Sequence, residues 1–118
     1  MEIKKFNIDG SNVEFVNESY STRNGFKHVT HCFINGVDKG EHTIHYINRT
    51  WECYPFQTAM RGLINGLIES RTEFLKDKFK FDNDYKILNE KRRKEFEKYI
   101  VDDDKLNFYT ELKSAIGY

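Results

Sequence analysis

The densest group of side chains that can recognise a ligand lies in residues 48–57, where the chain reads Asn-Arg-Thr-Trp-Glu-Cys-Tyr-Pro-Phe-Gln. This segment holds the only Trp and the only Pro of the sequence. The guanidinium of Arg49 can fork onto phosphate oxygens, while the indole of Trp51 and the amide of Gln57 are suited to a nucleobase. The segment therefore predicts a nucleotide-binding site. The alternative is a structural role, in which Trp51 fills the core and Arg49 pairs with Glu52.

Histidines are the other residues whose spacing resembles a chemical motif, because they form two His-x-x-His pairs. Both pairs fall in strand-like runs, and residues three apart in a strand point to opposite faces of the sheet. Neither pair can therefore act as a local chelate, and no Cys or carboxylate stands beside them at ligand spacing. We expect no metal site. The four residues are His28, His31, His42 and His45.

The sequence contains no recognisable catalytic motif. There is no G-x-S-x-G, no P-loop and no G-x-G-x-x-G sequence. Cys32 and Cys53 are too few for a disulfide framework, and we expect both to be reduced structural thiols. We therefore expect a binding protein without catalytic residues and without a cofactor, not an enzyme.

Composition predicts one globular domain spanning residues 1–118, since 38% hydrophobic and 15% aromatic residues suffice for a single core. Nineteen basic and nineteen acidic residues cancel, which counts against a nucleic-acid partner. The basic run Lys91–Lys94 is flanked by glutamates and is expected to form surface ion pairs. No apolar run reaches the length of a membrane span, and the first five residues lack a signal-peptide pattern, so we expect a cytoplasmic protein that avoids membranes.

The elements that position these side chains follow from hydrophobic periodicity and turn signals. Four strand-like runs cover residues 2–8, 12–20, 26–34 and 41–48. Asp9-Gly10, Asn24-Gly25 and Asn35-Gly36 separate them, and residues 38–40 are expected to lengthen the third loop. An antiparallel meander is the simplest topology, because sequential strands tend to be neighbours.

The second half of the chain predicts helices. Apolar residues recur at three- and four-residue spacing over residues 55–80, with Pro55 in the first turn. Two shorter helices are predicted within residues 85–117, with N-cap candidates at 102–104. Gly62 and Gly66 share one side of the long helix, and they mark either the close approach of another backbone or simple tolerance. The fold class is thus α+β, with a sheet in residues 1–48 followed by one long and two shorter helices.

The segment Asn-Arg-Thr-Trp-Glu after a hairpin, then an aromatic residue and Phe-Gln at the start of a helix, resembles small proteins of bacteriophages and prophages. In size and order of elements the chain most resembles the first Thoeris anti-defence family. The resemblance covers roughly residues 25–68. Proteins of that family sequester cyclic ADP-ribose isomers made by a host immune enzyme and do not cleave them.

This resemblance implies a cyclic nucleotide ligand, a homo-oligomer that holds it between subunits, and action in the cytoplasm of a bacterial host. The implied ligand contacts are Arg49, Trp51 and Gln57, with Arg23 and His28 as secondary candidates. One alternative is an anti-CRISPR or another protein–protein inhibitor of a host defence effector. A further alternative is a nucleic-acid-binding module that uses Lys91–Lys94.

Overall fold

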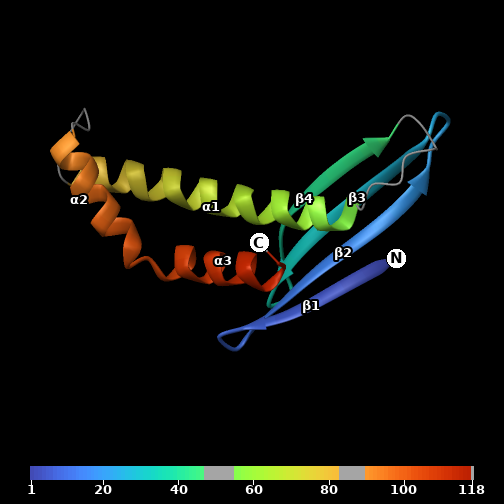
Figure 1. The fold of residues 1–118 in the computed structure, drawn as a ribbon, viewed down its shortest axis with the longest axis horizontal. Coiled ribbons are helices and arrows are strands. Elements are labelled where there is room, and N and C mark those ends of the chain that lie inside the picture. Colours follow the sequence, from blue (N-terminus) through green and yellow to red (C-terminus); the bar gives the residue numbers. More distant parts are fainter. Residues whose placement is uncertain (47–54, 83–89, 118) are drawn as a thin grey trace.

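The part of the chain that the structure describes forms a four-stranded sheet followed by three helices (Figure 1). This computed structural model describes residues 1–46, 55–82 and 90–117. The predicted α+β class, with one long and two shorter helices after an antiparallel sheet, is confirmed. The elements are β1 (Glu2–Ile8), β2 (Ser11–Ser21), β3 (Phe26–Ile34), β4 (Val37–Tyr46), α1 (Pro55–Asp82), α2 (Glu90–Val101) and α3 (Asp104–Ala115).

The sheet is an antiparallel meander in the order β1-β2-β3-β4, as the turn signals predicted. Asp9 and Gly10 have φ values of 50° and 83°, and Asn35 and Gly36 have 51° and 81°. Two consecutive positive φ angles define the two-residue turn whose twist matches that of the flanking strands. Asn-Gly and Asp-Gly are the residue pairs that reach this conformation most easily.

The predicted start of β4 at Glu41 was wrong, because the strand begins at Val37. Residues 38–40 do not lengthen the loop; they belong to the strand, which pairs with β3 through a register shift between His31 and Phe33. A bulge of this kind accommodates extra residues without ending the ladder. The predicted end of β4, at residues 47 and 48, lies outside the described residues.

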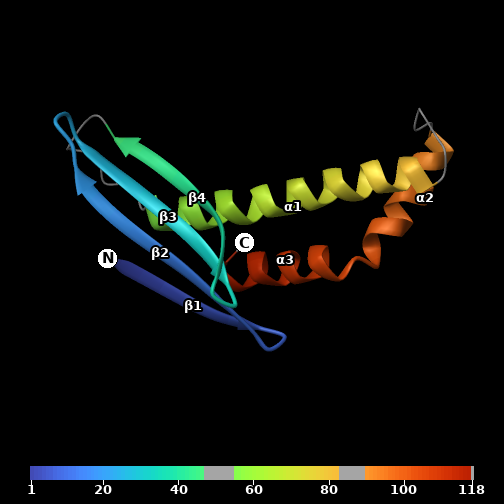
Figure 2. The ribbon, with the colours of Figure 1, turned by 180° about the vertical axis from the view of Figure 1, so that it is seen from behind.

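Helices α1 and α3 pack on one face of the sheet (Figures 1 and 2). Alternate residues of β2 and β3 supply this inner face, as the period of two in a strand requires. Thr30 donates a hydrogen bond to Asn17 at 3.0 Å, which satisfies the buried polar pair of this face. The buried residues of this core are Ile8, Val13, Phe15, Cys32, Phe56, Met60, Leu63, Ile64, Leu112 and Ile116.

A second core lies away from the sheet, where the end of α1 packs against α2 and the start of α3 (Figure 1). Its buried residues are Leu75, Phe79, Phe96 and Leu106. Ile68 packs against both cores, so the apolar interior continues from the sheet into the helical end. None of the described helices combines membrane-spanning length with sufficient apolar character.

The two glycines of α1 differ in their surroundings. A Cβ atom at Gly62 would lie 2.8 Å from Cδ2 of His42, so β4 and α1 approach closely at this point. A Cβ atom at Gly66 would meet nothing within 4 Å. The neighbour of Gly62 is thus the His42 side chain and not the backbone that was expected, and Gly66 is simply tolerated.

Candidate functional site

Of the five predicted ligand contacts, Arg49 and Trp51 lie outside the described residues. Gln57 is half-buried near the start of α1, where its Nε2 donates a hydrogen bond to the Ile116 carbonyl at 2.6 Å. This bond joins the start of α1 to the carboxyl end of α3. Its role in binding a ligand stays a prediction, and the structure adds a role in positioning α3.

Arg23 and His28 lie at the end of the sheet where β2 turns into β3. Arg23 is exposed in the turn, and His28 follows on the inner face of β3. Nδ1 of His28 and Oγ of Ser19 are 2.8 Å apart across the β2–β3 ladder. Their role as ligand contacts likewise stays a prediction.

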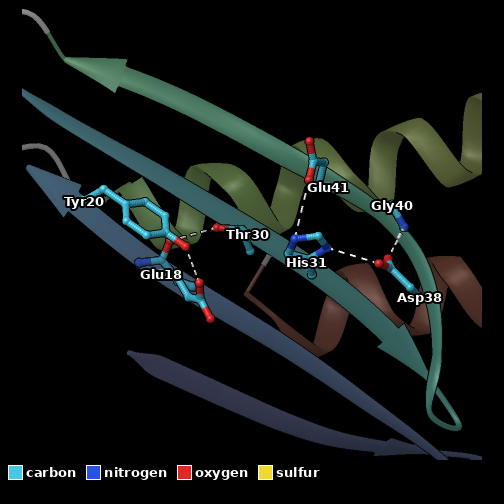
Figure 3. A network of polar contacts seen from close by, with 8 residues as sticks. Glu18, Tyr20, Thr30, His31, Asp38, Gly40 and Glu41 are labelled. Carbon is cyan, nitrogen blue, oxygen red and sulfur yellow. Dashed lines mark hydrogen bonds and ion pairs between the residues drawn. The ribbon is translucent and has the colours of Figure 1, made fainter. Parts of the chain in front are cut away.

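The histidines are divided between the two faces of the sheet. His31 lies on the outer face, with Nδ1 3.2 Å from an oxygen of Asp38 and Nε2 3.4 Å from an oxygen of Glu41 (Figure 3). These carboxylates approach opposite ring nitrogens, whereas metal ligands must converge on one point. His42 is on the inner face, against Gly62. Within residues 1–46, 55–82 and 90–117, no group of three or more His, Cys, Asp or Glu side chains is arranged to hold a metal.

Cys32 is fully buried in the main core. Burial, the largest cause, together with the nearby Asp38 carboxylate, raises the pKa of its thiol to about 12. A thiol must lose its proton to act as a nucleophile. At neutral pH Cys32 is therefore a small apolar core residue, as the sequence predicted, while Cys53 lies outside the described residues.

A cleft with a volume of about 230 Å³ opens between α3 and one end of the sheet. This is the end where β2 begins and β3 ends, opposite to the turn that carries Arg23. The cleft is lined by Ser11, Ile34, Lys39, Asp104, Lys105, Phe108 and Tyr109. It combines side chains of the sheet and of α3 that are distant in sequence.

The lining of this cleft suits an anionic ligand with an apolar or aromatic part. Lys39 and Lys105 provide two ammonium groups, which outnumber the single carboxylate of Asp104. The rings of Phe108 and Tyr109 meet edge to face, with centroids 5.8 Å apart. Burial raises the pKa of Tyr109, so its phenol remains a neutral hydrogen-bond donor. Ammonium groups bind phosphates, and aromatic faces stack on bases.

Asp103 fixes the end of α3 that carries Asp104 and Lys105. Its carboxylate accepts a hydrogen bond from the Leu106 N–H at 3.0 Å, which caps the helix as the sequence predicted for residues 102–104. The same carboxylate accepts from Nε and Nη2 of Arg71 at 3.1 and 2.8 Å. This pairing lowers the pKa of Asp103 and raises that of Arg71. Arg71 on α1 thereby positions one wall of the cleft.

Sequence reasoning missed both the cleft and the role of Arg71. The cleft has no local motif, because its residues come from the sheet and from α3, which α1 and α2 separate in the chain. The one available signal was the run of three aspartates, which identified the capped end of α3 but not the cation that pairs with it.

Comparison of the chain with protein-family models, with curated proteins and with solved structures found no match.

Proposed function

We propose that this protein binds and sequesters a cyclic nucleotide signal, such as a cyclic ADP-ribose isomer, without cleaving it. The observation that carries the proposal is the cleft between α3 and the sheet, where Lys39 and Lys105 lie beside Phe108 and Tyr109. In this proposal the ammonium groups hold the phosphates, and the aromatic rings contact the base.

Sequestration requires affinity and no turnover. A protein present above its dissociation constant lowers the free concentration of a signal by mass action, and no reactive group is needed. The proposed place of action is the cytoplasm of a bacterial host, where the signal would be made.

The size of the cleft bears on how the ligand is held. Pockets that enclose small molecules have volumes of about 300–1,000 Å³, and this cleft has about 230 Å³. A cyclic ADP-ribose isomer would therefore fill the cleft with part of its structure and extend beyond it. We propose that the remainder contacts a second subunit of a homo-oligomer, to which the segment 48–57 contributes Arg49 and Trp51.

Isothermal titration with a cyclic ADP-ribose isomer, followed by chromatography of the recovered ligand, tests this proposal. Lys105→Ala removes one charge-assisted contact and should weaken binding by about tenfold or more, since such contacts contribute ~1.5–3 kcal/mol. The matched control is Lys91→Ala, which removes an exposed lysine on α2 and should leave binding unchanged.

Two outcomes would change or end the proposal. If Arg49→Ala abolishes binding while Lys105→Ala has no effect, the site lies in the segment 48–57 and not in the cleft. If the wild-type protein binds no cyclic nucleotide, or returns the ligand cleaved, the sequestration proposal is wrong.

A further inference from the structure

One face of the sheet is covered by no described helix. Helices α1 and α3 pack on the inner face, and Figures 1 and 2 show the outer face of all four strands turned away from them. Ile3 pairs with Val16, which pairs with His31, so these side chains form a row across the outer face. This row continues to Glu41 on β4.

The centre of the outer face is partly apolar. Val16, Val29 and Phe33 are half-buried, although no described helix packs on this face. The Phe33 ring stacks on the His31 ring, with centroids 6.0 Å apart and planes inclined by 26°. Ile3 is 46% exposed at the β1 edge of this centre. Such a patch with a charged rim is typical of a surface that binds another protein.

The rim of the outer face is acidic. Four carboxylates, on Glu14, Glu18, Asp38 and Glu41, accompany two ammonium groups, on Lys5 and Lys27, which leaves an excess of two negative charges. Of these groups, Lys5 lies 3.8 Å from Glu14, and both side chains are exposed. The outer face is therefore negative, although the whole chain is formally neutral.

The carboxylates around His31 are held in place. Asp38 accepts a hydrogen bond from the Gly40 N–H at 2.9 Å with one oxygen and faces His31 with the other (Figure 3). Glu41 faces the second nitrogen of the same ring. Each carboxylate has lone pairs beyond the one that faces the ring, and these can accept hydrogen bonds from an incoming cation.

We infer that the outer face of the sheet binds a basic segment of another protein. Lysine or arginine side chains of that segment would pair with the carboxylate rim, while its apolar side chains would cover Val16 and Phe33. A second copy of this chain docked face to face would bring the acidic rims together, and nucleic acid would bring phosphates against them. Charge complementarity therefore favours a cationic protein partner, and this inference does not depend on nucleotide binding.

Fluorescence anisotropy with a labelled peptide of alternating lysine and valine tests this inference, and a peptide of alternating glutamate and valine serves as the negative probe. The double variant Glu14→Gln/Glu41→Gln removes carboxylates on both sides of the Phe33–His31 stack. It should weaken binding of the lysine peptide by about fivefold or more, as expected for the loss of two surface ion pairs. The matched control, Glu69→Gln/Glu73→Gln, removes two exposed carboxylates from α1 and should bind as wild type does.

Several results would overturn the inference. Equal weakening in both double variants would mean general charge attraction, and equal binding of the two peptides would exclude a role for the acidic rim. Lack of saturable binding by the lysine peptide would exclude a cationic partner of this kind. A dimer in analytical ultracentrifugation that dissociates in Glu14→Gln/Glu41→Gln would assign the outer face to a second copy of the chain.

Discussion

Substitution of Asp103 should reveal how strongly α3 is held against the rest of the protein. In Asp103→Ala the Leu106 N–H loses its cap, at a cost of about 1 kcal/mol. The Arg71 guanidinium, whose side chain is only 22% exposed, loses the carboxylate that accepts two of its hydrogen bonds. Leaving such a donor unpaired costs about 1–3 kcal/mol. The free energy of unfolding should therefore fall by about 2–4 kcal/mol, from a total that is ~5–15 kcal/mol for a domain of this kind.

Urea unfolding followed by far-ultraviolet circular dichroism measures this loss of stability. One further variant separates the ion-pair part from the capping part, and a second serves as the control. Asp103→Asn keeps a capping side chain but removes the charge, so it should lose only the ion-pair part, about 1–3 kcal/mol. Asp102→Ala changes an exposed neighbour and should remain within about 0.5 kcal/mol of wild type. If Asp103→Ala also remains within that range, the contacts of Asp103 do not hold α3 and the reasoning is refuted.

The same carboxylate makes stability depend on pH. Because Arg71 lowers the pKa of Asp103 below its ordinary value of 3.8, the folded state binds this proton less readily than the unfolded state. The stabilisation is complete above that ordinary value and is lost as the pH falls through the lower, folded-state pKa. The pKa of Glu111 is raised by its hydrogen bond to Asp9, which gives an effect of opposite sign. The difference between wild type and Asp103→Asn in acid urea titrations isolates the contribution of Asp103.

Two further predictions concern α1 and the main core. Gly62→Ala should lower the free energy of unfolding by about 1–3 kcal/mol through overpacking against His42. Gly66→Ala should raise it by up to about 1 kcal/mol, because a Cβ atom there meets nothing within 4 Å. Urea midpoints of the two variants that move in the same direction would contradict this prediction. Cys32 should react with a thiol reagent only on unfolding, measured in a Cys53→Ser background, and rapid reaction of the native protein would show that this thiol is accessible.

The sheet was largely predictable because its signals are local. Alternation of apolar side chains placed Val13 and Phe15 on one face of β2, and Asp-Gly and Asn-Gly marked turns with positive φ. The start of β4 was missed because the register shift opposite His31 and Phe33 depends on pairing with β3. No sequence pattern in β4 alone indicates it.

The contacts that position α3 were not predictable, because each joins residues far apart in the chain. Arg71 and Asp103 are 32 positions apart, and Gln57 and Ile116 are 59 positions apart. Such pairs depend on how α1 and α3 dock, which helical periodicity does not specify. We predicted Gln57 as a ligand contact because of its amide, and its predicted place near the start of a helix is correct. Its hydrogen bond to Ile116 at the end of α3 is known only from the structure.

The candidate site likewise has one part that sequence predicted and one part that it did not. The composition of the segment 48–57 predicted ligand contacts there, and Arg49 and Trp51 remain predictions. The cleft was found only from the structure, since Lys39 and Lys105 have no motif in common and meet only when α3 packs beside the end of the sheet. Lysines are common surface residues, and these two could contribute to a binding site only because the fold brings them together. No single segment of the sequence predicts that proximity.

Native mass spectrometry of the protein mixed with cyclic ADP-ribose isomers and cyclic dinucleotides tests the central proposal most directly, because one spectrum gives both the assembly state and the bound mass. The proposal predicts an oligomer that carries an intact cyclic nucleotide and loses it in the Lys105→Ala variant. A protein that remains bare across the whole panel, or that carries only a cleaved nucleotide, would contradict it.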